Sequence, residues 1–498
     1  MKQFLAAAKR GVLLGILAAM AIPAARAQEQ SDPESRIKLL EQMMQQMQQQ
    51  RAEQEKQMQA LSAELTAVQQ QLAQNKDQKI AEKGKGTGNP VSASFKDGLV
   101  FEDGSGDWKL QINGRIQADY RTYEPTLWKN DTFSIRRARF GGTFSFLKDF
   151  AVRVEGEYAN DNTGAKGTTA LTHGYLDFTR WKGAKIRAGQ FKPFFGLERA
   201  HSTNFIDFTE LSLATNNGTI FTSTYDRGVM LHGDPLPWLN YNVYAVNGTG
   251  QNNDDASDGK DIGGRVNANF ASLAQIRNAV IHVGASASKG RIGFSTSTGS
   301  SISQVTEGSG ATFFTVTGLG DAQADRSRRG LETALAYGPV KLQAEYINAN
   351  FVGRRIGSAT NTPNTDRLYD NDINVWYADL NWLVTGESWA DSYKSGAFGR
   401  IKPKRNFDEK GGWGAFELGL RYSKYDASDF KLLLPTATAS TSYTSEADAW
   451  TAAAKWIFNP NARLVLNYVH TRFDTPIRIL GKTDQTENAI VLRAQYDF

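Results

Sequence analysis

The sequence predicts an all-β protein, a 16-stranded antiparallel transmembrane β-barrel with an N-terminal periplasmic α-helical coiled coil. Three observations lead to the barrel. Apolar and polar residues alternate along many short segments, the connections between these segments alternate in length, and the final segment is a strand that ends on an aromatic residue. Alternation with a period of two is typical of strands that have one lipid-facing side and one water-facing side.

Residues 1–27 have the pattern of a secretory signal peptide. Three bases within the first ten residues form a positive n-region, an apolar run extends from Gly11 to Ile22, and residues 25–27 form an A-x-A cleavage site. An N-terminal anchor is the alternative, but the apolar run is shorter than a membrane-spanning helix requires. We therefore expect an exported protein.

The charge of the chain does not point to a polyanionic partner. The full sequence carries 57 Lys and Arg against 52 Asp and Glu, a formal charge of +5. Residues 1–27 hold four of these bases and no acid, so the remaining chain carries only +1. We therefore expect no nucleic acid as a partner.

Enzyme chemistry is also not expected. The sequence contains no cysteine, which excludes disulfides and thiolate metal sites. Its five histidines are scattered, without the spacing of a metal site, and no serine motif has a positioned base. We predict no catalytic residue, no metal and no cofactor.

Residues 28–78 are predicted to form a periplasmic coiled-coil segment. From Ile37 to Leu72 a spacing of three and four alternates, and nine of the eleven positions are apolar. This heptad predicts a left-handed coiled coil and hence an oligomer, whereas a single solvated helix is the alternative. The Gly- and Lys-rich residues 79–94 are predicted to form a flexible linker.

Residues 95–498 are predicted to form the barrel. The segment "WKLQINGRIQADYR" (108–121) has an apolar face with an aromatic residue at each end and a wholly polar opposite face. This pattern predicts a membrane strand with aromatic girdles and a wet lumen. The other predicted strands are 133–146, 149–159, 171–180, 184–191, 225–233, 238–247, 261–271, 277–290, 328–338, 340–351, 369–384, 412–425, 446–458, 461–474 and 485–498.

The connections between the predicted strands support the barrel. Even-numbered connections are short, as in "NP" (459–460), and odd-numbered ones are long and polar, as in 192–224 and 291–327. Outer-membrane barrels have short turns on one side and long loops on the other. The exception is 385–411, which is long although it falls on the turn side. A secreted β-solenoid or a periplasmic lectin is the alternative fold.

Basic residues gather on the predicted lumen face. Guanidinium groups offer forked donors to phosphate-like oxygens, so such a cluster can select anions. Solvated charge of no special function is the alternative. Arg136 is out of phase with its strand and lies near the loop end, where the mouth or a subunit contact can take it. The inward-facing bases on the first, second and fifth strands are Lys109, Arg115, Arg121, Arg137, Arg139, Lys185 and Arg187.

The third long loop, 192–224, is predicted to fold into the barrel. Its first part has four phenylalanines among charged residues, which no lipid-facing strand can accommodate. A wide barrel leaves an aqueous channel, which an inward loop narrows. We expect Lys192, Arg199 and His201 to line the gap and Glu198 to pair with one of them. An extracellular lid is the alternative.

Five segments resemble the phosphate-selective porins of the O and P type, and the similarity covers about 95–498. This resemblance implies a trimer of sixteen-stranded barrels in the outer membrane of a Gram-negative bacterium, which passes phosphate-like anions through a basic constriction. The segments are "IRRARFGGTF" (135–144), "RAGQFKPFFGLERA" (187–200), "LVTGES" (383–388), "WGAFELGLRYS" (413–423) and "NPNARLVLNYVH" (459–470).

The resemblance also assigns individual residues to the anion site. The paired arginines that open the family's second strand match Arg136 and Arg137, and the base after "GLE" matches Arg199. Ser202 matches a nearby serine. Where the family has a ladder of arginines, residues 292–325 contain no Lys or Arg.

Two further positions depart from the family pattern. Thr203 stands where the family has a lysine, and Lys192 stands where it has a tyrosine. We predict passive diffusion of anions, most simply phosphate or polyphosphate. A general porin with weak anion preference is one alternative, and a structural tether to peptidoglycan through the coiled coil is another. The expected partners are outer-membrane lipid, phosphate-like anions and further copies of the chain.

Overall fold

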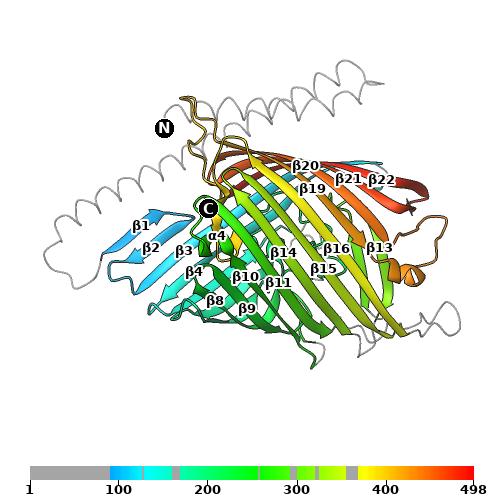
Figure 1. Ribbon diagram of the computed structural model, residues 1–498, viewed down its shortest axis with the longest axis horizontal. Helices are drawn as coiled ribbons and strands as arrows, with labels where there is room; N and C mark the ends of the chain where they lie inside the picture. Colours follow the sequence, from blue (N-terminus) through cyan, green and yellow to red (C-terminus); the bar gives the residue numbers. More distant parts are fainter. Residues whose placement is uncertain are drawn as a thin grey trace, which may run out of the picture. The chain divides into compact units, whose positions relative to one another are not determined.

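The computed structural model of this chain describes residues 90–125, 128–159, 169–221, 223–255, 258–291, 300–319, 325–354 and 368–498 (Figure 1). The predicted signal peptide and coiled-coil segment lie outside these residues and stay predictions. Within the described ranges, no helix is both long and apolar enough to cross a membrane.

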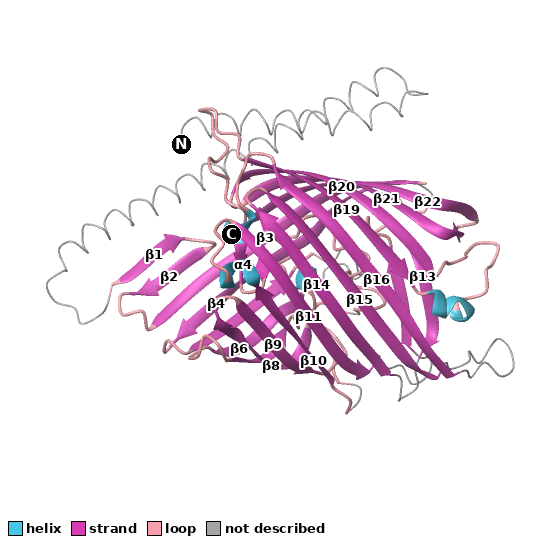
Figure 2. Ribbon diagram, viewed as in Figure 1, coloured by secondary structure: helices cyan, strands magenta, loops and turns pink. Residues whose placement is uncertain are grey.

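Sixteen antiparallel strands form a closed β-barrel (Figure 2). Each pairs with the next barrel strand along the chain, and β22 closes the sheet on β3, from Asn488 opposite Glu124 to Asp497 opposite Arg115. Every strand overlaps a segment predicted from the sequence. The strands are β3 (Trp108–Glu124), β4 (Thr132–Phe146), β5 (Phe150–Glu157), β6 (Ala170–Phe178), β7 (Lys185–Phe191), β8 (Asp226–Leu236), β9 (Leu239–Val246), β10 (Asp261–Asn269), β11 (Ala279–Arg291), β14 (Asp325–Tyr337), β15 (Val340–Arg354), β16 (Leu368–Leu383), β19 (Ala415–Asp426), β20 (Glu446–Asn459), β21 (Ala462–Ile479) and β22 (Lys482–Asp497).

The barrel has its apolar side chains outside and its polar side chains inside. Along β15, Leu342 and Tyr346 are 47% and 44% exposed on the outer face, whereas Lys341 and Gln343 are fully buried on the inner face. A soluble protein buries its apolar side chains, so this reversed distribution is that of a barrel surrounded by lipid. The period of two in the sequence therefore separates a lipid-facing apolar side from a polar inner side, as the pattern predicts.

Parts of several connections pack within the barrel. The connection between β11 and β14 contains a hairpin whose Phe313 and Phe314 are buried against Tyr377 and Tyr425 of the wall. Aromatic packing of this kind holds a polar loop in place inside a wide barrel. The hairpin consists of β12 (Ser300–Val305) and β13 (Thr312–Leu319), and the short helices are α3 (Leu197–Ala200), α4 (Phe270–Leu273), η2 (Trp389–Ser392) and η3 (Ser428–Leu433).

The connection between β16 and β19 explains the exception in loop length. It contains η2 and the small hairpin β17 (Tyr393–Lys394) and β18 (Ala397–Phe398). Trp389 and Phe398 of this segment pack in one buried cluster with Leu197 from the third long loop. The ammonium group of Lys341 lies 4.1 Å from the centre of the Trp389 ring. The connection is long because it packs against residues inside the barrel.

A hairpin that the sequence pattern did not reveal precedes the barrel. β1 (Val91–Phe95) pairs with β2 (Leu99–Asp103), and β2 pairs with residues 109–112 of β3. Its turn contains Asp97 and Gly98, both with positive φ, and Asp-Gly is a hairpin signal. Residues 91–94 therefore belong to a strand and not to the predicted linker. The hairpin strands are five residues each, too short for the membrane pattern to select.

Candidate functional site

The third long loop, residues 192–225, contacts lumen-facing side chains of a distant strand. The Glu345 carboxylate on β15 accepts hydrogen bonds from the Leu197 N–H at 2.9 Å and the Glu198 N–H at 2.5 Å. Gly196 precedes them with a φ of 71°, and a Cβ there would lie 2.2 Å from Glu345 Oε2. Only glycine suits this approach. The prediction that this loop folds inward agrees with these contacts.

The prediction that Glu198 pairs with a base of its own loop is wrong. Its Oε1 lies 3.0 Å from Nη1 of Arg421 on β19, and its Oε2 accepts a hydrogen bond from Ser212 Oγ at 2.7 Å. Glu307, between β12 and β13, holds the other side of the same guanidinium at 2.8 Å. A buried charge requires such a partner, and the wall supplies it. Glu198 therefore fastens the loop and leaves the loop's bases unneutralised.

His201 does not line the gap. It is 1% exposed, its ring lies edge-on to Phe398, and neither ring nitrogen has a hydrogen-bond partner within the described ranges. Burial lowers the pKa of His201 to about 3, so the ring is neutral at neutral pH. It contributes no charge to the lumen.

A β-bulge in the second barrel strand turns Arg136 inward beside Arg137. On β4, Arg137 pairs with Gln117 and Ile135 with Ala118, so Arg136 is the extra residue between them. A bulge re-aims the side chain of the extra residue. The phase of Arg136 in the sequence suggested a place at the mouth or in a subunit contact. The bulge directs its side chain into the barrel instead. It points to an acid of the third long loop.

That acid is Glu210, where three guanidinium groups meet. Arg136 holds it with two bonds of 2.7 and 3.0 Å, and Nη2 of Arg121 and of Arg493 lie 2.5 and 3.0 Å from its Oε1. Asp119 lies 2.7 Å from both Arg121 and Arg493. The arginines keep the pKa of Glu210 well below its usual value against the effect of burial. Sequence reasoning missed Glu210 because loop residues have no periodicity to place them.

Two other predicted bases also have carboxylate partners. Arg139 lies 2.6 Å from Glu157, and Arg187 makes two bonds of 2.7 and 2.8 Å to Asp177. Lys185, at the turn-side end of β7, has no ion pair within the part of the chain that the structure describes. Paired guanidiniums offer fewer donors to a passing anion than unpaired ones.

Besides Lys185, four of the predicted bases have no carboxylate within 4.0 Å among the described residues, namely Arg115, Arg137, Lys192 and Arg199. We call them the unpaired bases. Their hydrogen bonds go to neutral groups, which leave their charge uncompensated. The neutral partners are Thr203 and Asn204 for Arg115, Gln117 for Arg137, the His201 carbonyl for Lys192, and the Thr215 and Ser223 carbonyls for Arg199.

The unpaired bases act on one another. The pKa of Lys192 lies well below its usual value because of burial and then because of the positive charges on Arg199, Arg139, Arg115 and Arg137. Like charges that lower a lysine pKa must be close to it. The charges that act on Lys192 thus come from both the wall and the third long loop.

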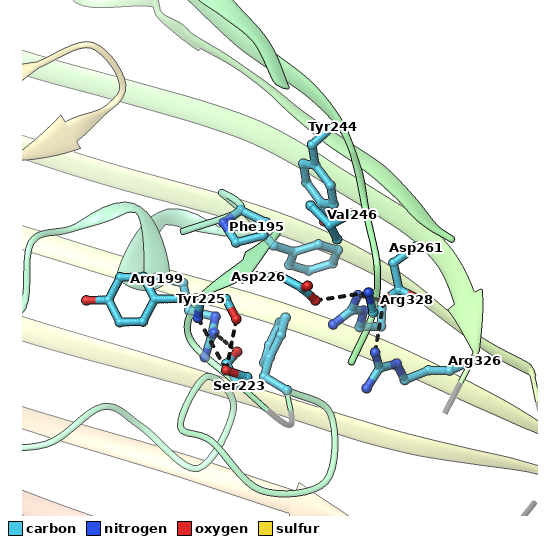
Figure 3. A pocket seen from close by; sticks show the side chains of 13 residues that line it. Phe195, Arg199, Ser223, Tyr225, Asp226, Tyr244, Val246, Asp261, Arg326 and Arg328 are labelled. Atoms are coloured by element: carbon cyan, nitrogen blue, oxygen red, sulfur yellow. Dashed lines mark hydrogen bonds and ion pairs between the residues drawn. The ribbon is translucent and has the colours of Figure 1, made fainter. Parts of the chain in front are cut away.

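Arg199 also lines a small cavity with two arginines of β14 (Figure 3). The cavity has a volume of about 40 Å³. The Arg199 guanidinium lies 4.1 Å from the centre of the Phe221 ring, and burial followed by the charge of Arg328 lowers its pKa to about 9. Arg326 and Arg328 share Asp261 at 3.0 and 3.2 Å.

The remaining predicted site residue, Ser202, is exposed on the third long loop, where its Oγ accepts a hydrogen bond from the Asn204 N–H at 3.3 Å. Within the described ranges, no group of three His, Asp or Glu could hold a metal ion. The arrangement is thus a wall and a loop that hold basic side chains close together. Positive charges held close together favour the approach of anions.

Comparisons with known proteins find relatives of this chain. The family model described as "Phosphate-selective porin O and P" matches residues 110–498. Porin O of Pseudomonas aeruginosa is 26% identical over 435 residues, which cover 82% of this chain and 93% of that protein. The solved anion-selective porin from Comamonas acidovorans aligns with a TM-score of 0.48 at 11% identity, over 78% of this chain and 100% of the other. The outer membrane channel DcaP of Acinetobacter baumannii gives 0.47 at 13% identity, over 80% and 99%.

The family model spans nearly the whole barrel, from the start of β3 to the end of β22. Proteins of this kind are channels of the outer membrane of Gram-negative bacteria and not enzymes. The matched range includes the strands and the loop that carry the basic residues described above. This chain belongs to the family of phosphate-selective porins O and P.

Proposed function

We propose that this outer-membrane porin passes anions by diffusion and that the unpaired bases provide the field that selects them. One observation carries this proposal. Arg115, Arg137, Lys192 and Arg199 have no carboxylate within 4.0 Å among the described residues, whereas Arg139 and Arg187 do. Uncompensated positive charge in a channel concentrates anions and repels cations.

The unpaired bases form a track that can replace the missing arginine ladder. Arg199 lines one cavity with Arg326 and Arg328 of β14, which Asp261 neutralises only in part. The charges of Arg199, Arg115 and Arg137 all act on Lys192. The bases that the family carries in the ladder segment are thus supplied here by β14, the third long loop and the first two barrel strands. β4 and the loop together form the basic constriction.

The substrate class that suits this track is phosphate or polyphosphate. A guanidinium fork matches two oxygens of a tetrahedral anion, and a lysine adds a point charge. Neutral donors near the track, such as Ser202 and Thr203, suit the remaining oxygens. Chloride passes the same track but cannot use the forked geometry.

Planar-bilayer recording of the purified protein tests the proposal. The reversal potential in a potassium chloride gradient gives the anion selectivity, and phosphate added to chloride shows whether it blocks the chloride current. We expect strong anion selectivity and block at low phosphate concentration. A cation-selective or unselective channel would refute the proposal.

A general porin with weak anion preference is the second candidate. It is favoured by the absence of Lys and Arg from 292–325 and by the three arginines that share Glu210. The same recording separates the two candidates. Weak selectivity without phosphate block supports the general porin.

A trimer is the assembly that we propose for this chain, with the coiled coil as a second contact between copies. The family resemblance and the heptad of 34–78 support this proposal. A tether from the coiled coil to peptidoglycan is the structural role to test beside it. Removal of 28–78 should leave the conductance unchanged, whereas loss of envelope integrity in the same strain would support the tether.

A further inference from the structure

Glu210 lies where an anion would bind. Three guanidiniums on the adjacent strands β22, β3 and β4 converge on its carboxylate, with four contacts of 2.5 to 3.0 Å. The side chain is 9% exposed. Arginine forks that surround one pair of oxygens are the arrangement that recognises phosphate and carboxylate ligands. Here the oxygens belong to the protein itself.

The carboxylate is delivered by the inserted loop and not by the wall. Its backbone is fixed, because the Glu210 carbonyl accepts a hydrogen bond from Arg421 Nη2 at 3.2 Å and the preceding Thr209 carbonyl accepts one from Arg493. The loop therefore holds the acid at one point of the barrel wall. Three guanidiniums against Asp119 and Glu210 leave one positive charge, and without Glu210 they would leave two.

We propose that Glu210 is an internal ligand that occupies an oxyanion site formed by Arg121, Arg136 and Arg493, and thereby weakens the binding of phosphate-like anions. This inference rests on the proposed anion selectivity and adds the residue that limits it. A channel must bind its ion weakly enough to release it. The carboxylate of Glu210 blocks the site formed by the three arginines. Passing anions therefore bind at the unpaired bases, which hold them less tightly.

Replacement of the charge at this position tests the proposal. In Glu210→Gln the three guanidiniums lose their shared carboxylate, so the phosphate concentration for half-block of the chloride current should fall about tenfold or more, the range of one charge-assisted hydrogen bond. Glu210→Asp keeps the charge but withdraws it by one methylene, so the half-block concentration should lie between those of the natural protein and Glu210→Gln. This conservative variant provides the answer if Glu210→Gln does not fold, which heat-induced unfolding followed by circular dichroism will show.

Asp177→Asn is the matched control. It makes the same change in net charge but releases a single guanidinium, that of Arg187. We expect a small rise in anion selectivity and no tenfold change in phosphate block. Equal effects of Asp177→Asn and Glu210→Gln would overturn the proposal, because net charge would then explain both.

The proposed function and this inference fail in different ways. If the natural protein is not anion-selective, the proposed function fails. If it is anion-selective but Glu210→Gln and Glu210→Asp bind phosphate no more tightly than the natural protein, the inference fails alone. In that case Glu210 serves only to fasten the loop to the arginines of the wall.

Discussion

Arg137 provides the sharpest test of the unpaired bases. It lies on β4, is 7% exposed, and donates to the neutral Gln117 at 2.8 Å. Arg137→Gln removes its charge and keeps a polar side chain in the same place. No described carboxylate lies within 4.0 Å of Arg137, so removal of its charge lowers the net charge of the lumen by one.

The size of the effect follows from Coulomb's law. Two unit charges about 4 Å apart interact with about 1 kcal/mol in water and with about 4 kcal/mol at an effective dielectric constant of about 20. The energy of about 1 kcal/mol, which applies in water, is the better description of ions in a water-filled lumen. A loss of about 1 kcal/mol lowers anion occupancy about fivefold and raises cation occupancy by a similar factor.

The assay is the reversal potential of single channels in a potassium chloride gradient, followed by phosphate titration. Arg137→Gln should move the reversal potential toward that of an unselective channel. Arg137→Lys should keep the selectivity but weaken phosphate block, because the charge remains and the fork is lost. The double variant Arg187→Gln with Asp177→Asn removes a neutral pair and should change neither. A reversal potential unaltered in Arg137→Gln would refute the reasoning.

Three further outcomes follow from the structure. Because burial and neighbouring arginines hold the pKa of Lys192 well below its usual value, anion selectivity should fall with rising pH well before the usual lysine pKa of about 10 is reached, and Lys192→Arg should flatten this reversal-potential profile. Gly196→Ala should destabilise the protein by at least about 1 kcal/mol in thermal unfolding. Gly106→Ala, with a similar φ of 72° but no atom within 4 Å of its Cβ, should cost less, and equal costs would contradict the Gly196 contact. Deletion of 91–103 should leave single-channel conductance unchanged, and altered conductance would place the hairpin in the ion path.

The strands were predictable from the sequence because a membrane barrel requires alternation along every strand. The same regularity concealed the bulge at Arg136. One extra residue shifts the alternation along the strand, so in the sequence Arg136 looks like a residue on the outer face. The two faces of β4 are defined only by its pairing with β3, in which Gln117 and Ala118 flank the irregularity. Long-range pairing is therefore what corrected the placement of Arg136.

The candidate site was predictable only in its basic half. Lumen-facing arginines follow from strand phase, but their partners come from loop residues far away in sequence. Glu210 and Glu198 are both acids of the third long loop, and nothing local distinguishes the one that meets three wall arginines from the one that meets Arg421. His201 was misplaced for the same reason, because its burial depends on Phe398 of a turn-side segment.

The first barrel strand has two partners on one edge, and this has a consequence for assembly. β2 occupies residues 109–112 of β3, and β22 occupies residues 115–124 of the same edge. A slip of one residue in strand pairing exchanges the two faces of a strand. A barrel that closes in the wrong register would therefore turn polar side chains toward the lipid. Here a local hairpin can already stand on the edge before the last strand arrives. The hairpin keeps β22 from pairing with residues 109–112, and the C-terminal Phe498 pairs with Gly114 beside it, which limits the registers open to the seam.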